Sequence, residues 1–407
     1  MRLITLALLL VPLALGAEGV SQRGFLEMRG VGYAETAPND RAQAIGEALL
    51  RYEASANLTA WLRVAGGVDA RADTHRQTER ELRMDWKDRT AMRPALSVRR
   101  LSLVVGRSPV TLELGKQFIR WGRADILNPT DRFAPRDYLS VVDNDFLAIV
   151  AARLTIETHG NTLDAVFSPR FTPSRTPLLN QRWAALPPAL ANLRLVDLGS
   201  VFPRTGQFGV RWSRVGRGFE HSLSFYEGFN HLPQFAGQYN AQQPVVEFER
   251  LFPRQRMYGA DVALPLPWLT VKGEAAYFQT RGRQADEYVQ YVVQLERQSG
   301  ELTLVGGYAG EVVTRDRGLG GFAPDRGLTD AFLARGSYTI DTRRNVAVEA
   351  AARRTGEGVW VRGEYSQAFG RHWRVIVVVT AVRGRLSDFL GQYRRNSHAL
   401  IILRYSF

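Results

Sequence analysis

Apolar and polar residues alternate along most of the chain in segments of roughly ten residues, which is the pattern of an extended strand with two different faces. In the segment 287–297 the apolar face consists of Val289, Tyr291, Val293 and Leu295. The segments 268–280, 345–354 and 359–367 repeat the alternation with charged residues on the second face. Repetition of this pattern predicts the strands of a transmembrane β-barrel, with one face toward lipid and the other toward the lumen.

The breaks between these segments are alternately short and long. Short turns are expected near Asn57, Arg107, Gly160, Gly216, Pro265, Ser299, Thr342 and Gly370. Longer or richer connections are expected at 35–45, 74–95, 119–146, 172–205, 230–254, 281–286, 315–327, near Gly356 and at 384–395. A soluble β-sandwich has no reason to keep its long loops at one end, whereas an outer-membrane barrel has short periplasmic turns and long extracellular loops. We therefore predict an all-β fold, an antiparallel up-and-down transmembrane β-barrel of about 18 strands, with about 16 as the alternative count.

The N-terminal residues indicate export. Arg2, the apolar run 3–15 and the small residues that follow have the three parts of a secretory signal peptide, which we assign to residues 1–17. The apolar run is shorter than the ~20 residues that a membrane-spanning helix needs. The remaining residues, 18–407, form the predicted barrel domain.

The C-terminal residues predict the compartment. One face of the last strand is apolar throughout, and it consists of Ala399, Ile401, Leu403, Tyr405 and Phe407. A terminal phenylalanine in this setting resembles the signal by which barrels of the bacterial outer membrane are recognised for assembly. We therefore place the protein in the outer membrane of a Gram-negative bacterium, with membrane lipid and the barrel assembly machinery as expected partners.

Composition then narrows the chemistry. The chain has no cysteine, which excludes a disulfide scaffold and a cysteine-ligated metal site. Its formal net charge is +13, and only Lys87, Lys116 and Lys272 are lysines among 53 basic residues. A basic protein first suggests nucleic acid as a partner. Here the arginines are scattered along strands among carboxylates of an exported chain, so we predict no nucleic-acid partner.

The charged residues on the polar faces are expected to line the lumen. They are Arg51, Glu53, Arg63, Asp69, Arg71, Lys272, Glu274, Glu349, Arg353, Arg362 and Glu364. Their mixed signs allow cross-strand pairs that brace the wall. The surplus of arginine would add a positive field that favours anions.

The stretch 115–138, GKQFIRWGRADILNPTDRFAPRDY, begins as a strand and then breaks into turn-forming residues. Its prolines disfavour continued strand pairing, because proline lacks the backbone N–H donor and restricts the backbone conformation of the residue before it. We predict that the connection 119–146 folds into the lumen as a constriction, as porin-like barrels often do. The residues assigned to this constriction motif are Gly115, Gln117, Arg120, Trp121, Gly122, Arg123, Asp125, Asn128, Pro129, Asp131, Arg136 and Asp137.

Ion pairs within this connection are expected to hold it, since an unpartnered charge screened from water costs several kcal/mol. The expected pairs join Arg120, Arg123, Arg132 and Arg136 to Asp125, Asp131 and Asp137, with Arg136 as the chosen partner of Asp131. A structural interpretation stays open beside direct solute contact. In that interpretation Trp121 belongs to the aromatic girdle, and Asp125, Asn128 and Asp131 cap turns.

The same stretch resembles the "G-[RK]-Q … WG … NP-x-D" pattern of a loosely defined group of proteobacterial outer-membrane barrel proteins of uncharacterised function. The matching positions are Gly115, Gln117, Trp121, Gly122, Asn128, Pro129 and Asp131. Many members of the group are encoded beside exporters of hydrophobic compounds, and alginate-export and capsule-assembly barrels are more distantly similar. The resemblance implies a porin-like barrel that passes a hydrophobic or anionic solute, with an inner-membrane exporter as a further partner.

We therefore predict an outer-membrane channel or export conduit, without a cofactor, a metal or an enzymatic activity. The histidines His75, His159, His221, His231, His372 and His398 have no metal-ligand spacing. A surface-binding barrel with a blocked lumen, which anchors polysaccharide or lipid, is the alternative. An outer-membrane hydrolase is weaker, and its best fragment contains His221, Ser222, Ser224 and His231.

Overall fold

The computed structural model describes the chain from residue 19 onward, and the predicted signal peptide 1–17 lies outside the described residues. The described residues are 19–186, 190, 193–240, 242, 245–281, 285–317 and 322–407. Among them, no helix is long and apolar enough to cross a bilayer.

The period-two segments of the sequence form a closed antiparallel barrel of 18 strands. The strands are β1 (Val20–Tyr33), β2 (Ala44–Asn57), β3 (Leu62–Asp73), β5 (Leu96–Arg107), β6 (Val110–Gln117), β9 (Ile149–Thr158), β10 (Asn161–Ser168), β12 (Gln207–Val215), β13 (Glu220–Phe229), β16 (Arg254–Pro265), β17 (Thr270–Thr280), β18 (Glu287–Ser299), β19 (Leu302–Arg315), β20 (Ala331–Thr339), β21 (Arg344–Arg353), β22 (Val359–Phe369), β23 (Trp373–Arg383) and β24 (His398–Ser406).

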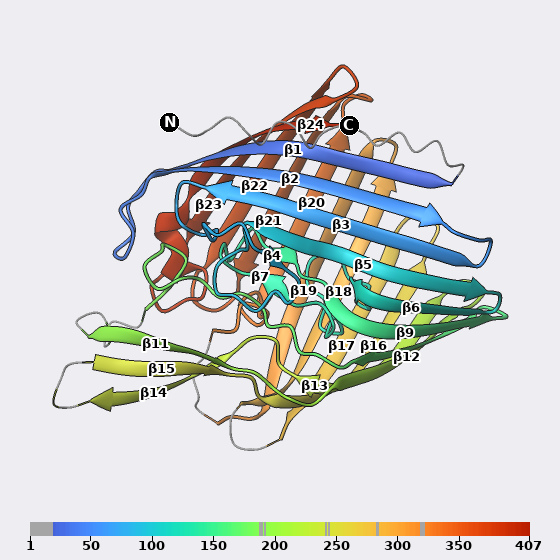
Figure 1. Ribbon diagram of the computed structural model, residues 1–407, viewed down its shortest axis with the longest axis horizontal. Coiled ribbons are helices and arrows are strands. Elements are labelled where there is room, and N and C mark those ends of the chain that lie inside the picture. The colour runs from blue at the N-terminus through green and yellow to red at the C-terminus, as the bar shows by residue number, and fades with distance from the viewer. Residues whose placement is uncertain are drawn as a thin grey trace.

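Each of these strands pairs with its neighbour along the chain, and the first pairs with the last (Figure 1). The closing register runs from Phe25 opposite Ser406 to Tyr33 opposite His398. Closure leaves the wall without a free strand edge, so every wall strand has hydrogen-bond partners on both sides. The fold prediction and the count of 18 are confirmed, and the short and long connections alternate along the chain as predicted.

The two faces of the wall differ as the alternation predicts. On β18 the outward Val293 is 51% exposed, whereas its neighbour Gln294 is 1% exposed and faces the interior. On β24 the outward Ile401 is 58% exposed and the inward Leu400 is buried. An exterior of exposed aliphatic and aromatic side chains around a closed barrel is the surface that a lipid-facing wall requires.

The long connections contain further structure that the sequence did not predict. A small sheet has the order β11 (Arg194–Val201), β15 (Val245–Leu251) and β14 (Gln234–Asn240), with β11 parallel to β15. Figure 1 shows this sheet at the lower left, near the long connections. Short elements accompany it, namely β4 (Met84–Asp85), β7 (Arg136–Asp137), β8 (Asp145–Phe146) and the 3-10 helix η2 (Gly391–Asn396).

The connection between β6 and β9 packs against the inner wall. Its residues Ile119, Trp121 and Phe133 belong to one buried cluster with Tyr226 of β13 and Phe278 of β17. The Trp121 and Phe133 rings meet edge to face at 5.3 Å, and Phe133 meets Tyr226 in the same way at 5.0 Å. The aromatic-girdle interpretation of Trp121 is therefore wrong, because its side chain is 2% exposed and packs inside the barrel.

Candidate functional site

The constriction motif begins where β6 departs from ordinary strand geometry. Gly115 has a φ of +121°, and a Cβ at this position would lie 2.3 Å from the Leu101 carbonyl oxygen, so only glycine fits. The next two side chains, Lys116 and Gln117, are both buried. Gln117 donates to the carbonyl of Ala151 at 3.0 Å on the adjacent β9. Gly115 and Gln117 thus fix the point at which the chain leaves the wall.

The WG and NPxD parts of the motif form one compact turn. The Asp131 carboxylate accepts hydrogen bonds from the backbone N–H groups of Trp121 and Gly122. The Asn128 amide donates to the carbonyl of Ala124. A Cβ on Gly122 would lie 2.4 Å from the Asn128 Cβ, so the two arms of the turn touch. These contacts fit the turn-capping interpretation of Asn128 and Asp131, with Pro129 at the bend between them.

The loop is bound to the wall through carboxylates on neighbouring strands. Glu274 of β17 accepts hydrogen bonds from the backbone N–H groups of residues 123, 124 and 130 at 2.8, 3.0 and 2.9 Å. Arg123 pairs with Asp261 of β16 at 2.6 Å and with Glu220 of β13. Lys272 of β17 pairs with Asp125 at 2.9 Å. The wall therefore supplies the counter-charges of this loop.

A second, deeper set of charges joins three connections. Asp137 pairs with Arg93 at 2.9 Å and with Arg175 at 3.2 Å. Arg175 also pairs with Asp88 at 2.8 Å, and Asp88 pairs with Lys116 at 2.5 Å. Burial alone would raise the pKa of Asp137, but Arg93 and Arg175 outweigh burial and hold that pKa far below its ordinary value. We call these five residues the buried charge network.

The predicted pairs within the loop are largely wrong. Only Arg120 and Asp131 pair as expected, at 3.3 Å. The chosen Asp131–Arg136 pair is wrong, because the Asp131 carboxylate is occupied by the backbone of its own turn. Arg136 instead donates to Asn144 at 2.9 Å and stacks on Phe146 at 4.1 Å. The loop runs between the wall and other connections, so its charges find partners on either side.

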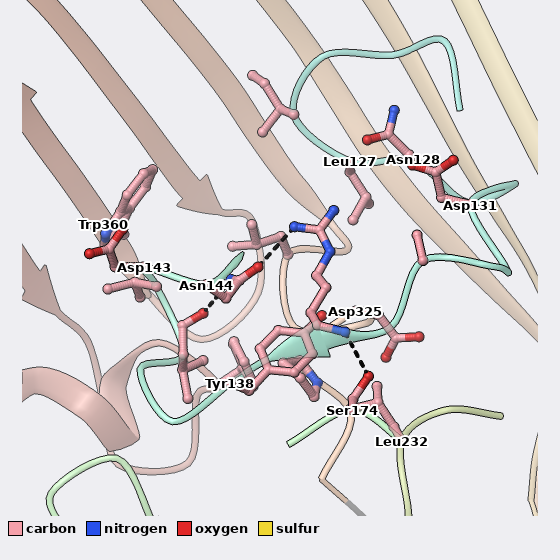
Figure 2. Close-up of a pocket in the computed structure, with 18 of the residues that line it drawn as sticks. Leu127, Asn128, Asp131, Tyr138, Asp143, Asn144, Ser174, Leu232, Asp325 and Trp360 are labelled. Atoms are coloured by element: carbon pink, nitrogen blue, oxygen red, sulfur yellow. Dashed lines mark hydrogen bonds between the residues drawn. The ribbon is translucent and has the colours of Figure 1, made fainter. Parts of the chain in front are cut away.

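A cavity of about 330 Å³ lies inside the barrel between this loop and the wall strands β18 and β20 to β22. In Figure 2 the labelled Asp143, Asn144 and Trp360 lie on one side of it, and Asn128 and Asp131 lie on the other. The arginines in its lining are Arg132, Arg136, Arg335 and Arg362, and the carboxylates are Asp125, Asp131, Asp143, Asp325 and Glu349. Polar groups of both signs thus surround the cavity.

Most of these charges are compensated. Arg362 pairs with Asp143, Arg335 with Glu349 and Arg132 with Asp325, at 3.3, 3.3 and 3.7 Å. Among the described residues of this lining, Arg136 is the arginine that pairs with no carboxylate. Arg136 is therefore the unpaired positive charge of a lining whose described residues include five carboxylates and four arginines.

The predicted lumen-lining residues fall into separate groups. Glu349 and Arg362 line the cavity. Lys272 and Glu274 contact the loop as described, and Arg353 pairs with Asp388 of the 384–395 connection at 2.7 Å.

The remaining members form pairs along the wall. Arg51–Asp69 at 2.7 Å and Arg23–Glu53 at 2.6 Å join neighbouring strands, and Arg63 is exposed and bonds Ser55 at 3.1 Å. Arg71–Asp69 and Arg362–Glu364, both at 3.0 Å, join residues two apart on one strand. Arg51 and Asp69 lie directly opposite each other on β2 and β3.

Sequence reasoning missed four members of the buried charge network, namely Lys116, Asp88, Arg175 and Arg93. Lys116 carried a signal, since it is one of three lysines in a chain that otherwise uses arginine. The histidine and serine side chains of the fragment considered for a hydrolase do not form a catalytic group. His221 stacks on Phe219 at 5.2 Å, whereas its neighbour Ser222 is buried and bonds Asp261.

No protein-family model matches this chain, and no curated protein matches it. The chain is similar in structure to a BenF-like porin from Pseudomonas fluorescens Pf-5, with a TM-score of 0.56, 10% identity and coverage of 96% of this chain and 98% of the porin. It is similar to Pseudomonas aeruginosa OpdK with vanillate, with a TM-score of 0.55, 10% identity and coverage of 95% and 98%. It is also similar to Acinetobacter baumannii OccAB4, with a TM-score of 0.54, 9% identity and coverage of 96% and 99%. The chain therefore has the fold of an outer-membrane porin.

Proposed function

We propose that this protein is an outer-membrane channel whose constriction is formed by the connection 119–146. The observation that carries the proposal is the cavity of about 330 Å³ inside a closed barrel, bounded on one side by this connection and on the other by the wall. The wall charges hold the connection in place through Glu274, Asp261 and Lys272. In the proposed channel, a loop fixed in this way sets the width of the passage.

The proposed solute is a small anion or an uncharged apolar molecule, carried inward or outward. Arg136 supports the anion, because it is the arginine of the described lining that no carboxylate pairs with. Its guanidinium stacks on Phe146, which holds it in place and leaves donors for a carboxylate. The similar OpdK structure contains vanillate, the anion of an aromatic acid, and this supports the same solute class.

Reversal potentials across planar bilayers under a KCl gradient test the proposal. The wild-type protein is expected to conduct with a preference for chloride, and Arg136→Gln should lower the chloride-to-potassium permeability ratio by about twofold or more. Arg107→Gln is the matched control, since Arg107 is exposed at the end of β5, beside the short turn to β6. An unchanged ratio in Arg136→Gln would refute the role of Arg136.

The second candidate is a surface-binding barrel with a blocked lumen. The dense packing of Trp121, Phe133 and Phe278 inside the barrel favours it. If the correctly assembled protein does not conduct, the surface-binding barrel is favoured over the channel.

The partners belong to the same proposal. The barrel assembly machinery would recognise the C-terminal strand β24 before this strand pairs with β1, and an inner-membrane exporter would supply solute if transport runs outward.

Hydrolysis of generic esters by the purified protein would instead support the hydrolase.

A further inference from the structure

A second cavity, of about 790 Å³, lies between the small sheet and the connections at the long-loop end of the barrel. We call it the outer cavity. Its apolar lining includes Leu195, Val246 and Phe248 from the small sheet, with Trp183, Phe322 and Tyr393 from the connections. These are large aliphatic and aromatic side chains from segments far apart in the sequence. They form a concave apolar surface of the size that small molecules occupy in proteins, roughly 300 to 1,000 Å³.

The small sheet presents a suitable wall to this cavity. Along β15, Val246 and Phe248 face the cavity, whereas Glu247 between them is exposed on the opposite face. The strand is fixed to β11 by Arg250, which forms two hydrogen bonds of 2.7 Å with the Asp197 carboxylate. The cavity wall is thus tied by a bidentate ion pair as well as by the sheet.

The charged groups of the lining are already paired. Arg326 pairs with Glu311 at 2.6 Å and with Asp286 at 3.0 Å. Arg353 pairs with Asp388 at 2.7 Å. An ionic ligand would therefore have to break one of these pairs to gain a counter-charge, which an uncharged ligand avoids.

We propose that the outer cavity binds an uncharged apolar molecule of small-molecule size. Phe389 lines both the outer cavity and the inner cavity that contains Arg136, so a bound molecule lies one side chain away from the proposed passage. The outer cavity would then concentrate an apolar solute at the channel entrance. This second step rests on the proposed channel function, whereas binding itself does not.

Fluorescence of N-phenyl-1-naphthylamine, an uncharged apolar dye, tests binding to the full barrel in nanodiscs, with empty nanodiscs as the background. Saturable binding is expected. 8-Anilinonaphthalene-1-sulfonate has a similar ring system with a negative charge, and it should bind at least about tenfold more weakly. Equal or tighter binding of the sulfonate would overturn the assignment of an uncharged ligand.

Two variants impair the site in different ways. Gly237 lines the cavity, and a Cβ added there would meet Val246 Cγ1 at 3.4 Å, an ordinary contact, so Gly237→Phe should occupy part of the cavity without disturbing the sheet. Val246→Asp places a charge in the apolar lining. Its matched control is Val245→Asp, because Val245 is the neighbouring residue on the opposite face of β15.

Both cavity variants should weaken dye binding by about tenfold or more, while Val245→Asp should bind like the wild type. Equal dye binding in all four proteins would overturn the proposal. Dye binding in lipid-free amphipol that disappears in nanodiscs would also overturn it, because a lipid acyl chain would then be the occupant. Dye binding is measured independently of conductance. A protein that binds the dye but does not conduct therefore refutes the channel and still supports this binding site.

Discussion

Asp137→Ala is the sharpest test of how the connection 119–146 is held. The Asp137 carboxylate is buried and accepts from Arg93 at 2.9 Å and from Arg175 at 3.2 Å. It also accepts from the backbone N–H of Leu139 at 3.1 Å. Alanine removes the negative charge while both guanidinium groups stay in a site screened from water. We expect the connection to detach more often from its neighbours.

The size of the effect follows from the remaining partners. Removing one member of a buried ion pair costs roughly 3 to 5 kcal/mol. The lower end applies here, because Arg175 keeps Asp88 at 2.8 Å and Arg93 keeps Glu47 at 3.4 Å. A loss of about 3 kcal/mol shifts the equilibrium between docked and released loop by about 150-fold. The barrel itself should assemble normally, since its wall is held by inter-strand hydrogen bonds.

Limited trypsin digestion of the assembled barrel measures this equilibrium, because cleavage after Arg132 or Arg136 requires a released loop. When opening is fast relative to cleavage, the cleavage rate follows the population of the open form, so Asp137→Ala should be cut about a hundredfold faster. Asp341→Ala is the control, since Asp341 pairs with Arg344 on the exposed turn between β20 and β21. A rate in Asp137→Ala within about twofold of this control would refute the reasoning.

Further outcomes test the wall, its closure and one buried histidine. Val348→Arg places a charge on the exposed face of β21 and should destabilise the barrel by about 2 to 4 kcal/mol near the bilayer midplane. Ala347→Arg on the inner face, beside the opposing β22, should be tolerated. Equal urea midpoints of the two variants in lipid would contradict this difference. Deleting Phe407 should lower the heat-modifiable fraction on detergent gels, because its backbone exchanges two hydrogen bonds of 3.0 Å with Gly24 across the closure; an unchanged fraction would exclude that role. Burial lowers the pKa of His231 from 6.5 to about 4. The unfolded chain therefore binds this proton first as the pH falls, and about 3 kcal/mol of stability present above pH 6.5 should be lost by pH 4. Thermal unfolding across this window should show the loss, and His231→Gln should flatten it.

The wall could be predicted from the sequence because its signals are local. Strands such as β18 carry a period-two alternation, and turn residues such as Gly160 and Gly370 have a positive φ where the strands reverse. Closure fixes the number of strands once the short and long breaks are counted. The inward packing of Trp121 was missed, since nothing in its neighbours distinguishes an interior ring from a ring at the membrane interface.

The partners of the charges could not be predicted, because they depend on how distant connections meet. Asp137 finds Arg93 and Arg175, which belong to two other loops, so spacing along the chain carries no signal of the pairing. The small sheet was missed for a related reason. β11 pairs with β15 in parallel across a long stretch of intervening chain that includes two barrel strands, and neither segment is long enough to stand out alone.

The scarcity of lysine has a practical consequence for labelling. Lys116 is buried within the charge network, and Lys272 is held between Asp125 and Glu296. Lys87 is exposed on the connection between β3 and β5. An amine-reactive dye should therefore attach to the side chain of Lys87 before the other two lysines. A fluorophore could thus be placed on the long connection between β3 and β5 of the wild-type protein, without introducing a cysteine into a chain that has none.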